Sequence, residues 1–286
     1  MRVALANLHF GEEPPITGKG GSGTIFFSGC TLRCSYCQNC QLSRDSLGTE
    51  IGIEVCADIF LQLQKRGGEN INLVTGTQFI PQIYESVAIA RDRGLAIPVL
   101  WNSSGYEVLE MMDVLDGFAD VFLPDLKTLC PKISRQLFQA PDYPERAAAA
   151  VVAMAERSLP ILDKQGRLRR GTMVRHLVLP GELEATEAVL RWYCEHLRGR
   201  SLISVMFQYI PIHHSSHLPP RGIHHTERDQ VMAMLEKLNI EDGFVQELEP
   251  GVAWVPDFRR DNPFPDDYSR VIWHWKHGFA DDILPT

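Results

Sequence analysis

The chain has 286 residues, of which 44% are hydrophobic, and a formal net charge of -8. A chain of this length buries roughly 75% of the surface of its unfolded form, so its core is large enough to fold without disulfides. The acidic balance argues against a large non-specific nucleic-acid surface, and no apolar run is long enough to span a membrane, so neither is expected as a partner.

The first residues, MRVALANLHFGEEPP, contain a short apolar run that ends in two glutamates. This segment lacks the length and the cleavage pattern of a secretory signal. We therefore expect a cytoplasmic protein with reduced thiols. In such a compartment a dense group of cysteines binds metal or takes part in catalysis more often than it forms disulfides.

Short apolar, β-branched runs alternate with longer segments of helical periodicity along the chain. This alternation is typical of βα units around a parallel sheet and predicts an α/β fold. The candidate strands are 24–28, 71–75, 97–102, 120–127, 172–180 and 202–211. The candidate helices, which have apolar residues at three- and four-residue spacing, are 53–65, 80–93, 106–115, 145–157 and 185–197.

The pattern loosens after residue 211 into a His- and Pro-rich loop, a helix at 226–238, a strand in FVQELE and an aromatic tail. We expect a βα domain over 1–211, with a cysteine loop at 29–40, and a C-terminal extension over 212–286 that packs on it. The extension is longer than a closing helix requires, so we expect it to cover part of the domain or a partner's binding site.

The histidines of the loop at 213–225 offer a possible second metal site. They share neither a helical face nor a fixed spacing, so an unliganded loop is the expected state. They are His213, His214, His217, His224 and His225.

Parallel βα folds place their chemistry at the carboxyl ends of the strands. Here the first strand runs into the cysteine loop, and polar residues stand at the ends of other strands. A purely structural core does not predict polar groups that converge on one rim, so we expect a functional site there. These residues are 75–78, 102–105, Asp125, Lys127, Gln208 and Tyr209.

The stretch GCTLRCSYCQNC holds four of the seven cysteines. Three of them, Cys30, Cys34 and Cys37, form C-x3-C-x2-C, and three thiolates on one tight loop can bind three irons of a 4Fe-4S cluster. The fourth iron is then open to an external ligand. Two alternatives recruit Cys40 as a fourth ligand: a structural zinc site, which lacks the usual second pair of ligands elsewhere, and a closed cluster in an electron-transfer or scaffold protein.

This cysteine spacing, with Tyr36 before the third cysteine and an apolar strand before the first, resembles the hallmark of the radical S-adenosylmethionine (SAM) superfamily. The stretch FGEEPPITGKGGSGTIFFSGC and the strand-end motifs are similar to the branch of the pyruvate formate-lyase activating enzyme, and most closely to its uncharacterised homologues. The likeness covers residues 10 to about 211, with further similarity in VQELE and WVPDF.

The resemblance implies a partial (β/α)6 TIM-like barrel and two cofactors, a 4Fe-4S cluster and SAM. In the family, SAM chelates the open iron, and an electron from the reduced cluster cleaves SAM to a 5'-deoxyadenosyl radical that takes a hydrogen atom from substrate. It implies an oxidoreductase with a reductant such as flavodoxin or ferredoxin. The substrate is either a glycyl-radical protein, for which the chain acts as activase, or a small molecule.

By position, Thr75, Gly76 and Thr77 match the Gly-Gly-Glu with which the family holds the SAM amino group. The acidic residue is missing here, but a threonine hydroxyl and backbone carbonyls can still accept from an ammonium. The literal Gly-Gly-Glu at 67–69 precedes the second strand, at the opposite end of the barrel, and is interpreted as a helix stop.

Asn102 and Ser103 stand where activating enzymes carry an Asp-Thr pair, and Asp125 and Lys127 stand in the family's Asp-Leu-Lys. Lys127 is expected to pair with the SAM carboxylate, and Asp125 to hold a cation or the ribose side. The alternative for Asp125 and Lys127 is a surface ion pair at a strand end.

Arg175 matches the arginine of the family's fifth strand. A buried arginine needs an anionic partner, which favours the SAM carboxylate. Gln208 and Tyr209 fall where the sixth strand meets adenosine, with a core tyrosine as the alternative for Tyr209. The family motif ends at Cys37, so Cys40 is expected to point away from the cluster, while Tyr36 belongs to the cofactor-binding loop.

Overall fold

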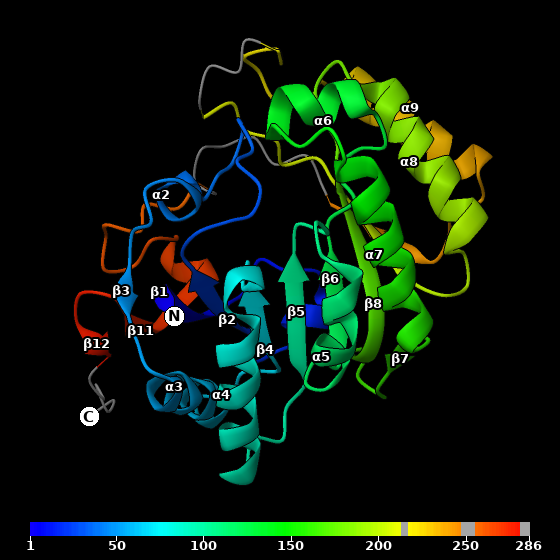
Figure 1. Ribbon diagram of the computed structural model, residues 1–286. Coiled ribbons are helices and arrows are strands. Elements are labelled where there is room, and N and C mark those ends of the chain that lie inside the picture. The colour runs from blue at the N-terminus through cyan, green and yellow to red at the C-terminus, as the bar shows by residue number, and fades with distance from the viewer. Residues whose placement is uncertain (213–216, 247–254, 281–286) are drawn as a thin grey trace.

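The computed structural model describes residues 1–212, 217–246 and 255–280. In them, one curved sheet carries helices along its outer face (Figure 1). Six consecutive strands of the sheet run parallel to one another, and each overlaps a predicted strand. They are β2 (Ser22–Phe27), β4 (Ile71–Val74), β5 (Val99–Ser103), β6 (Val121–Pro124), β8 (Leu168–Leu177) and β9 (Leu202–Met206).

Further strands extend this sheet on both sides, in the order β10-β9-β8-β6-β5-β4-β2-β1-β11-β12. The edge strands β10 and β12 do not meet, so the sheet is an unclosed, partial barrel, which confirms the predicted fold class. The added strands are β1 (Arg2–His9), β10 (Gly243–Val245), β11 (Ser269–His274) and β12 (Gly278–Phe279), with β3 (Thr49–Glu50) beside β1 and β7 (Ile161–Leu162) beside β8.

The helices follow the strands as crossover connections. The five long ones match predicted helices within about two residues at each end. They are α3 (Ile53–Lys65), α4 (Ile80–Asp92), α7 (Tyr143–Arg157), α8 (Leu183–His196) and α9 (His225–Lys237). The short ones are α1 (Pro14–Thr17), α2 (Cys40–Ser43), α5 (Met112–Asp116) and α6 (Pro131–Phe138), with 3-10 turns at Thr77–Phe79, Leu109–Met111 and Asp266–Tyr268.

The predicted helix at 106–115 is wrong at its start. A turn occupies this stretch first, because Gly105 has φ +74° and its N–H bonds to the side chain of Ser103. The chain becomes α-helical only at Met112. The predicted helices also omitted α6, whose start at Pro131 follows the cysteine at position 130.

The N-terminal apolar run is a strand that the sequence pattern did not identify. β1 pairs antiparallel with β2 on one side and with the C-terminal β11 on the other. The predicted strand in FVQELE is β10, parallel to β9, and its last residues lie outside the described part. Among the described helices none is both long and apolar enough to cross a membrane.

The amino end of the barrel is closed by α1. Its buried Ile16 packs inside the barrel with Leu100, Val121 and Met173 from three different strands. The opposite faces of the same strands pack on the helices through another apolar cluster, which includes Trp101. Since the amino end is filled with apolar side chains, open space is left toward the carboxyl ends of the strands.

Candidate cluster and cofactor site

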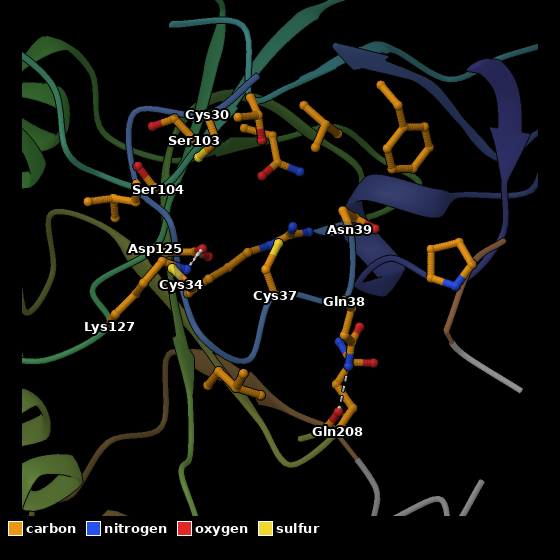
Figure 2. A pocket seen from close by; sticks show the side chains of 18 of the residues that line it. Cys30, Cys34, Cys37, Gln38, Asn39, Ser103, Ser104, Asp125, Lys127 and Gln208 are labelled. Carbon is orange, nitrogen blue, oxygen red and sulfur yellow. Dashed lines mark hydrogen bonds and ion pairs between the residues drawn. The ribbon is translucent and has the colours of Figure 1, made fainter. Parts of the chain in front are cut away.

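A cavity of about 290 Å³ lies at the carboxyl ends of the strands, under the cysteine loop. Figure 2 shows side chains from the loop and from several strands pointing into it. Most predicted site residues line this cavity: Cys30, Cys34, Tyr36, Cys37, Thr75, Asn102, Ser103, Asp125, Lys127, Arg175 and Gln208. Gly76 and Thr77 are not among its lining residues.

The cysteine loop carries three sulfur atoms into the cavity, from Cys30, Cys34 and Cys37. Burial is the main reason why the pKa of Cys30 rises to about 11 and that of Cys34 to about 12. The thiols of Cys30 and Cys34 therefore resist ionisation unless a cation accompanies them. An iron-sulfur cluster supplies that cation and takes thiolate ligands, so the donor set fits the group.

The backbone of the loop is held by neighbouring elements. The N–H of Ser35 donates to the carbonyl of Leu137 in α6 at 2.8 Å, and Arg44 donates to the carbonyl of Cys34 at 2.7 Å. The ring of Tyr36 packs against Phe138 of α6 and against Tyr209, with centroids 6.0 Å apart in both pairs. Tyr36 thus anchors the loop, and Tyr209 is a buried packing residue beside it.

Cys40 begins α2 and is not among the residues that line the cavity. The hydroxyl of Ser43, one turn further along, lies 3.4 Å from the sulfur of Cys37. The short helix therefore places a hydroxyl beside the third cysteine while Cys40 itself stays outside the cavity.

Asp125 and Lys127 form an ion pair in the wall of the cavity. Their side chains are 26% and 15% exposed, so this is not the surface pair considered as the alternative. Burial lowers the pKa of Lys127, but the carboxylate of Asp125, with smaller contributions from nearby tyrosine and cysteine side chains, outweighs burial and holds that pKa well above its usual value. Lys127 is therefore charged and faces the space beside the cysteines.

Tyr143 fixes the strand ends that carry this pair. Its hydroxyl lies 2.9 Å from the carbonyls of Ser104 and Asp125 and accepts the N–H of Lys127 at 2.9 Å. The residue lies in the first turn of α7 and is fully buried. Sequence reasoning missed it because a tyrosine at a helix start carries no signal of a contact with distant strands.

Thr75 is the one residue of the Thr-Gly-Thr stretch that faces the cavity. It has φ +60°, a left-handed conformation that is strained for a β-branched residue. Gly76 is packed from behind, since an added Cβ would lie 2.6 Å from Ile83. Of the three residues that match the family's SAM-binding stretch by position, only Thr75 therefore lines the cavity.

Thr77 points to a buried carboxyl that the sequence did not reveal. Its hydroxyl donates to Oε1 of Glu107 at 2.8 Å, and Nε1 of Trp101 donates to the same oxygen at 3.2 Å. Glu107 is 3% exposed, and burial raises its pKa. This group lies behind the cavity wall, where it holds the start of the 3-10 turn after β4.

Arg175 is bound to two carboxylates of the chain itself. Its Nη2 contacts both Glu12 and Glu13, from the segment before α1. Burial opposes the charge of each group, yet the pairing outweighs it: the pKa of Glu12 falls and that of Arg175 rises. The expectation of an anionic partner is met inside the protein, by glutamates 163 and 162 positions away.

Gln208 closes the cavity on the side of β9. Its carbonyl accepts from Nε2 of Gln38 at 3.0 Å, and its side-chain oxygen accepts from Gln246 at 3.0 Å (Figure 2 shows the first bond). Gln208 therefore connects the cysteine loop to β10. His213 and His214 of the predicted His-rich loop lie outside the described residues, as does Trp254 of the WVPDF motif.

The chain is similar to known proteins over most of its length. Residues 24–193 match the Radical SAM superfamily. An uncharacterized protein of Methanocaldococcus jannaschii, MJ0674, is 28% identical over 244 residues, which cover 82% of this chain and 67% of that protein.

Two solved structures share the fold at low identity. SuiB of Streptococcus suis, bound to its precursor peptide SuiA, aligns with a TM-score of 0.57 and 12% identity over 78% of this chain. HydG, the FeFe-hydrogenase maturase of Carboxydothermus hydrogenoformans, aligns with a TM-score of 0.56 and 15% identity over 78% of this chain. The chain spans about half the length of each, 48% of SuiB and 52% of HydG.

The matched region begins in β2, contains the three-cysteine loop, and ends in α8. It covers more than half of the 286 residues. The two predicted cofactors, a 4Fe-4S cluster and SAM, are those of the matched family. This chain belongs to the radical SAM superfamily.

Proposed function

We propose that this protein binds a 4Fe-4S cluster through Cys30, Cys34 and Cys37 and cleaves SAM reductively beside it. The observation that carries the proposal is the shared cavity, which the three sulfurs and the polar strand ends line together. The cluster and SAM supply a 5'-deoxyadenosyl radical that removes a hydrogen atom from substrate.

The residues of the chain would bind and orient SAM. Lys127, charged and largely buried, pairs with the SAM carboxylate, and Thr75 accepts from the amino group through its hydroxyl or carbonyl. Asn102 and Ser103 line the cavity from β5. We assign Asp125, which lines it from the neighbouring strand end, to the ribose or to a cation. Arg175 acts indirectly, because Glu12 and Glu13 hold its guanidinium.

Gln208 lines the same cavity just after the end of β9, where we place the adenine. Tyr36, whose ring is held by Phe138 and Tyr209, orients the loop itself. Reduced cysteines favour a cytoplasmic location, and none of the seven forms a disulfide. We assign the electron donor to a flavodoxin or ferredoxin.

The finer role that the motifs favour is that of a glycyl-radical activase, with a polypeptide loop as substrate. A protein of this fold, SuiB, binds a precursor peptide, so the fold is compatible with a polypeptide. A copurifying protein that acquires a glycyl radical after incubation with the reconstituted enzyme supports the activase role. Turnover of a small molecule without such a partner contradicts it.

The rival is a closed cluster with Cys40 as fourth ligand. Anaerobic reduction of the reconstituted protein with SAM distinguishes the two, because only an open iron yields 5'-deoxyadenosine. We expect the native protein and Cys40→Ser to form this product at similar rates. A fully loaded cluster that forms none, or a Cys40→Ser variant that gains the activity, would overturn the proposal.

A further inference from the structure

A second cavity, of about 210 Å³, adjoins the first inside the barrel. It lies between the segment 11–14 and the strands β8, β9 and β10, at the open edge of the sheet. Gly11, Glu12, Arg175 and Gln208 line both cavities, so the two spaces meet at these residues. A molecule in the second cavity would reach the first without crossing the sheet.

The charges around these spaces do not balance. In the described residues that line them, three carboxylates, of Glu12, Glu13 and Asp125, face two cations, Arg175 and Lys127. Lys127 is paired with Asp125, which leaves one guanidinium for two glutamates.

His9, which lines the first cavity, does not supply the missing positive charge. Burial lowers the pKa of His9, which keeps the ring neutral near pH 7. Glu12 uses its second oxygen to accept from Asn72 at 3.0 Å, so Glu13 is the carboxylate of the pair that is less fully engaged. The excess negative charge is therefore at the border of the second cavity.

The rest of the second cavity is mainly apolar. Met206 and Phe244 extend from neighbouring strands, and Val245 at its edge is 39% exposed. In the part of the chain that the structure describes, β10 is the edge strand of the sheet on this side. An apolar wall that leads to an excess carboxylate fits an alkyl chain that ends in a positive charge.

We propose that the second cavity binds a cationic group of the substrate, an ammonium or guanidinium on an alkyl chain, against Glu13. The proposal rests on the proposed function, since it places the remaining part of the substrate in the first cavity beside the cysteines. An anionic ligand is disfavoured because it would face all three carboxylates, two of which already contact Nη2 of Arg175.

The test uses Met206 as a reporter. The anaerobically reconstituted protein is labelled with methyl-¹³C methionine, the Met206 signal is assigned with Met206→Leu, and n-butylammonium or butylguanidinium is titrated. We expect saturable shifts of the Met206 methyl, with the buried core methionines Met112 and Met154 unchanged. Pentanoate and n-pentanol, of similar length, should shift it only weakly.

Two variants test separately the carboxylate of Glu13 and the free volume of the second cavity. Glu13→Gln should weaken butylammonium binding about tenfold, through loss of one charge-assisted contact. The matched control is Glu184→Gln, on the exposed face of α8, which should leave it unchanged. Phe244→Trp places a larger ring in the second cavity from β10, which carries none of the paired charges, and should also abolish the shift, which keeps the test valid if Glu13→Gln folds poorly.

A tripeptide with a central lysine, capped at both ends, distinguishes the sources of the cation. Tighter binding than butylammonium points to a polypeptide side chain, and weaker binding points to a small amine. Equal binding of pentanoate, or no response of Met206 to any cation, overturns the proposal. These measurements need no SAM cleavage, so a failure here leaves the test for 5'-deoxyadenosine unaffected.

Discussion

The two ends of the barrel differ in what surrounds their charged side chains. At the amino end, Glu69 accepts the N–H groups of Lys19 and Gly20 at 3.1 and 3.0 Å and pairs with Arg167. At the same end, Ile16 packs in the barrel interior with apolar side chains of the strands. At the carboxyl end, Lys127 and Thr75 face a cavity. A satisfied charge supports the fold, whereas a charge or a strained residue beside open space is available to a ligand.

The same contrast appears in two short motifs. The literal Gly-Gly-Glu at 67–69 ends α3, and Gly67 has φ +93°. Its glutamate is the one that binds Lys19 and Gly20 at the amino end. The stretch at 75–77 lacks the letters of the family motif but follows β4 at the carboxyl end. Of the two stretches, only the one after β4 has a residue in the cavity, Thr75, and this position on the strand is the reason why we propose Thr75 as a SAM contact.

The largest expected effect comes from the cysteines. Cys30→Ser, Cys34→Ser or Cys37→Ser should each abolish the visible absorbance of the reconstituted cluster and reduce 5'-deoxyadenosine to background, because each removes a thiolate ligand. Iron content and product are measured on the same samples. Cys40→Ser is the control and should keep both, and an equal loss in this variant would place Cys40 in the cluster.

Arg175→Ala should destabilise the protein by about 3 to 5 kcal/mol, since it leaves two buried carboxylates without their cation. Chemical denaturation of the cluster-free protein measures this. The matched control combines Arg175→Met with Glu12→Gln and Glu13→Gln, which removes all three charges and should recover most of the loss. If the single variant unfolds like the native protein, the ion cluster contributes no more than a surface pair.

Lys127→Ala should weaken SAM binding about ten- to hundredfold, because a charge-assisted bond to the SAM carboxylate is lost. The cluster should remain, since Lys127 is not a ligand. Equilibrium binding of SAM to the loaded protein measures the change. At the other end of the barrel, Arg167→Ala is the matched control and should leave SAM affinity as it is. If Lys127→Ala and Arg167→Ala weaken SAM binding equally, the two ends of the barrel do not differ in their contribution to SAM binding.

Much of the fold follows from local patterns. The parallel strands are short buried runs between helices of clear periodicity, so strands such as β4 and helices such as α3 are recognisable without tertiary information. β1 was missed because its partners, β2 and the C-terminal β11, determine that it is a strand. The turn at Gly105 delayed a helix that periodicity alone places too early.

Part of the candidate site likewise follows from local sequence features, and part depends on contacts between distant segments. Cysteine spacing and strand ends identify the cavity, because both are local features. The partners of Arg175 are 163 and 162 residues away, and Tyr143 contacts strands that precede it in the chain, so no local pattern predicts either. Such contacts form only when the barrel brings distant segments together, and they determine which of the predicted charges remain available to a ligand.

The smallest expected effect concerns Glu69. Burial pushes its pKa up, but hydrogen bonds from Gly20 and Arg167 outweigh burial and hold it below the usual 4.5. A depressed pKa means that the ionised form contributes stability above pH 4.5, and that this contribution is lost as the pH falls through the folded-state pKa. Glu69→Gln should therefore cost about 1 to 2 kcal/mol at pH 7.

The difference between Glu69→Gln and the native protein should begin to shrink as the pH falls below about 4.5, where the unfolded chain takes up the proton first, and should be lost below the lower folded-state pKa, where the native carboxyl is also neutral. Denaturation at several pH values measures it, with Glu50→Gln, whose side chain is 79% exposed, as the matched control. SAM affinity should not change, because Glu69 lies at the amino end. A loss of SAM affinity in this variant would mean that the literal Gly-Gly-Glu, and not the stretch at 75–77, serves the cofactor.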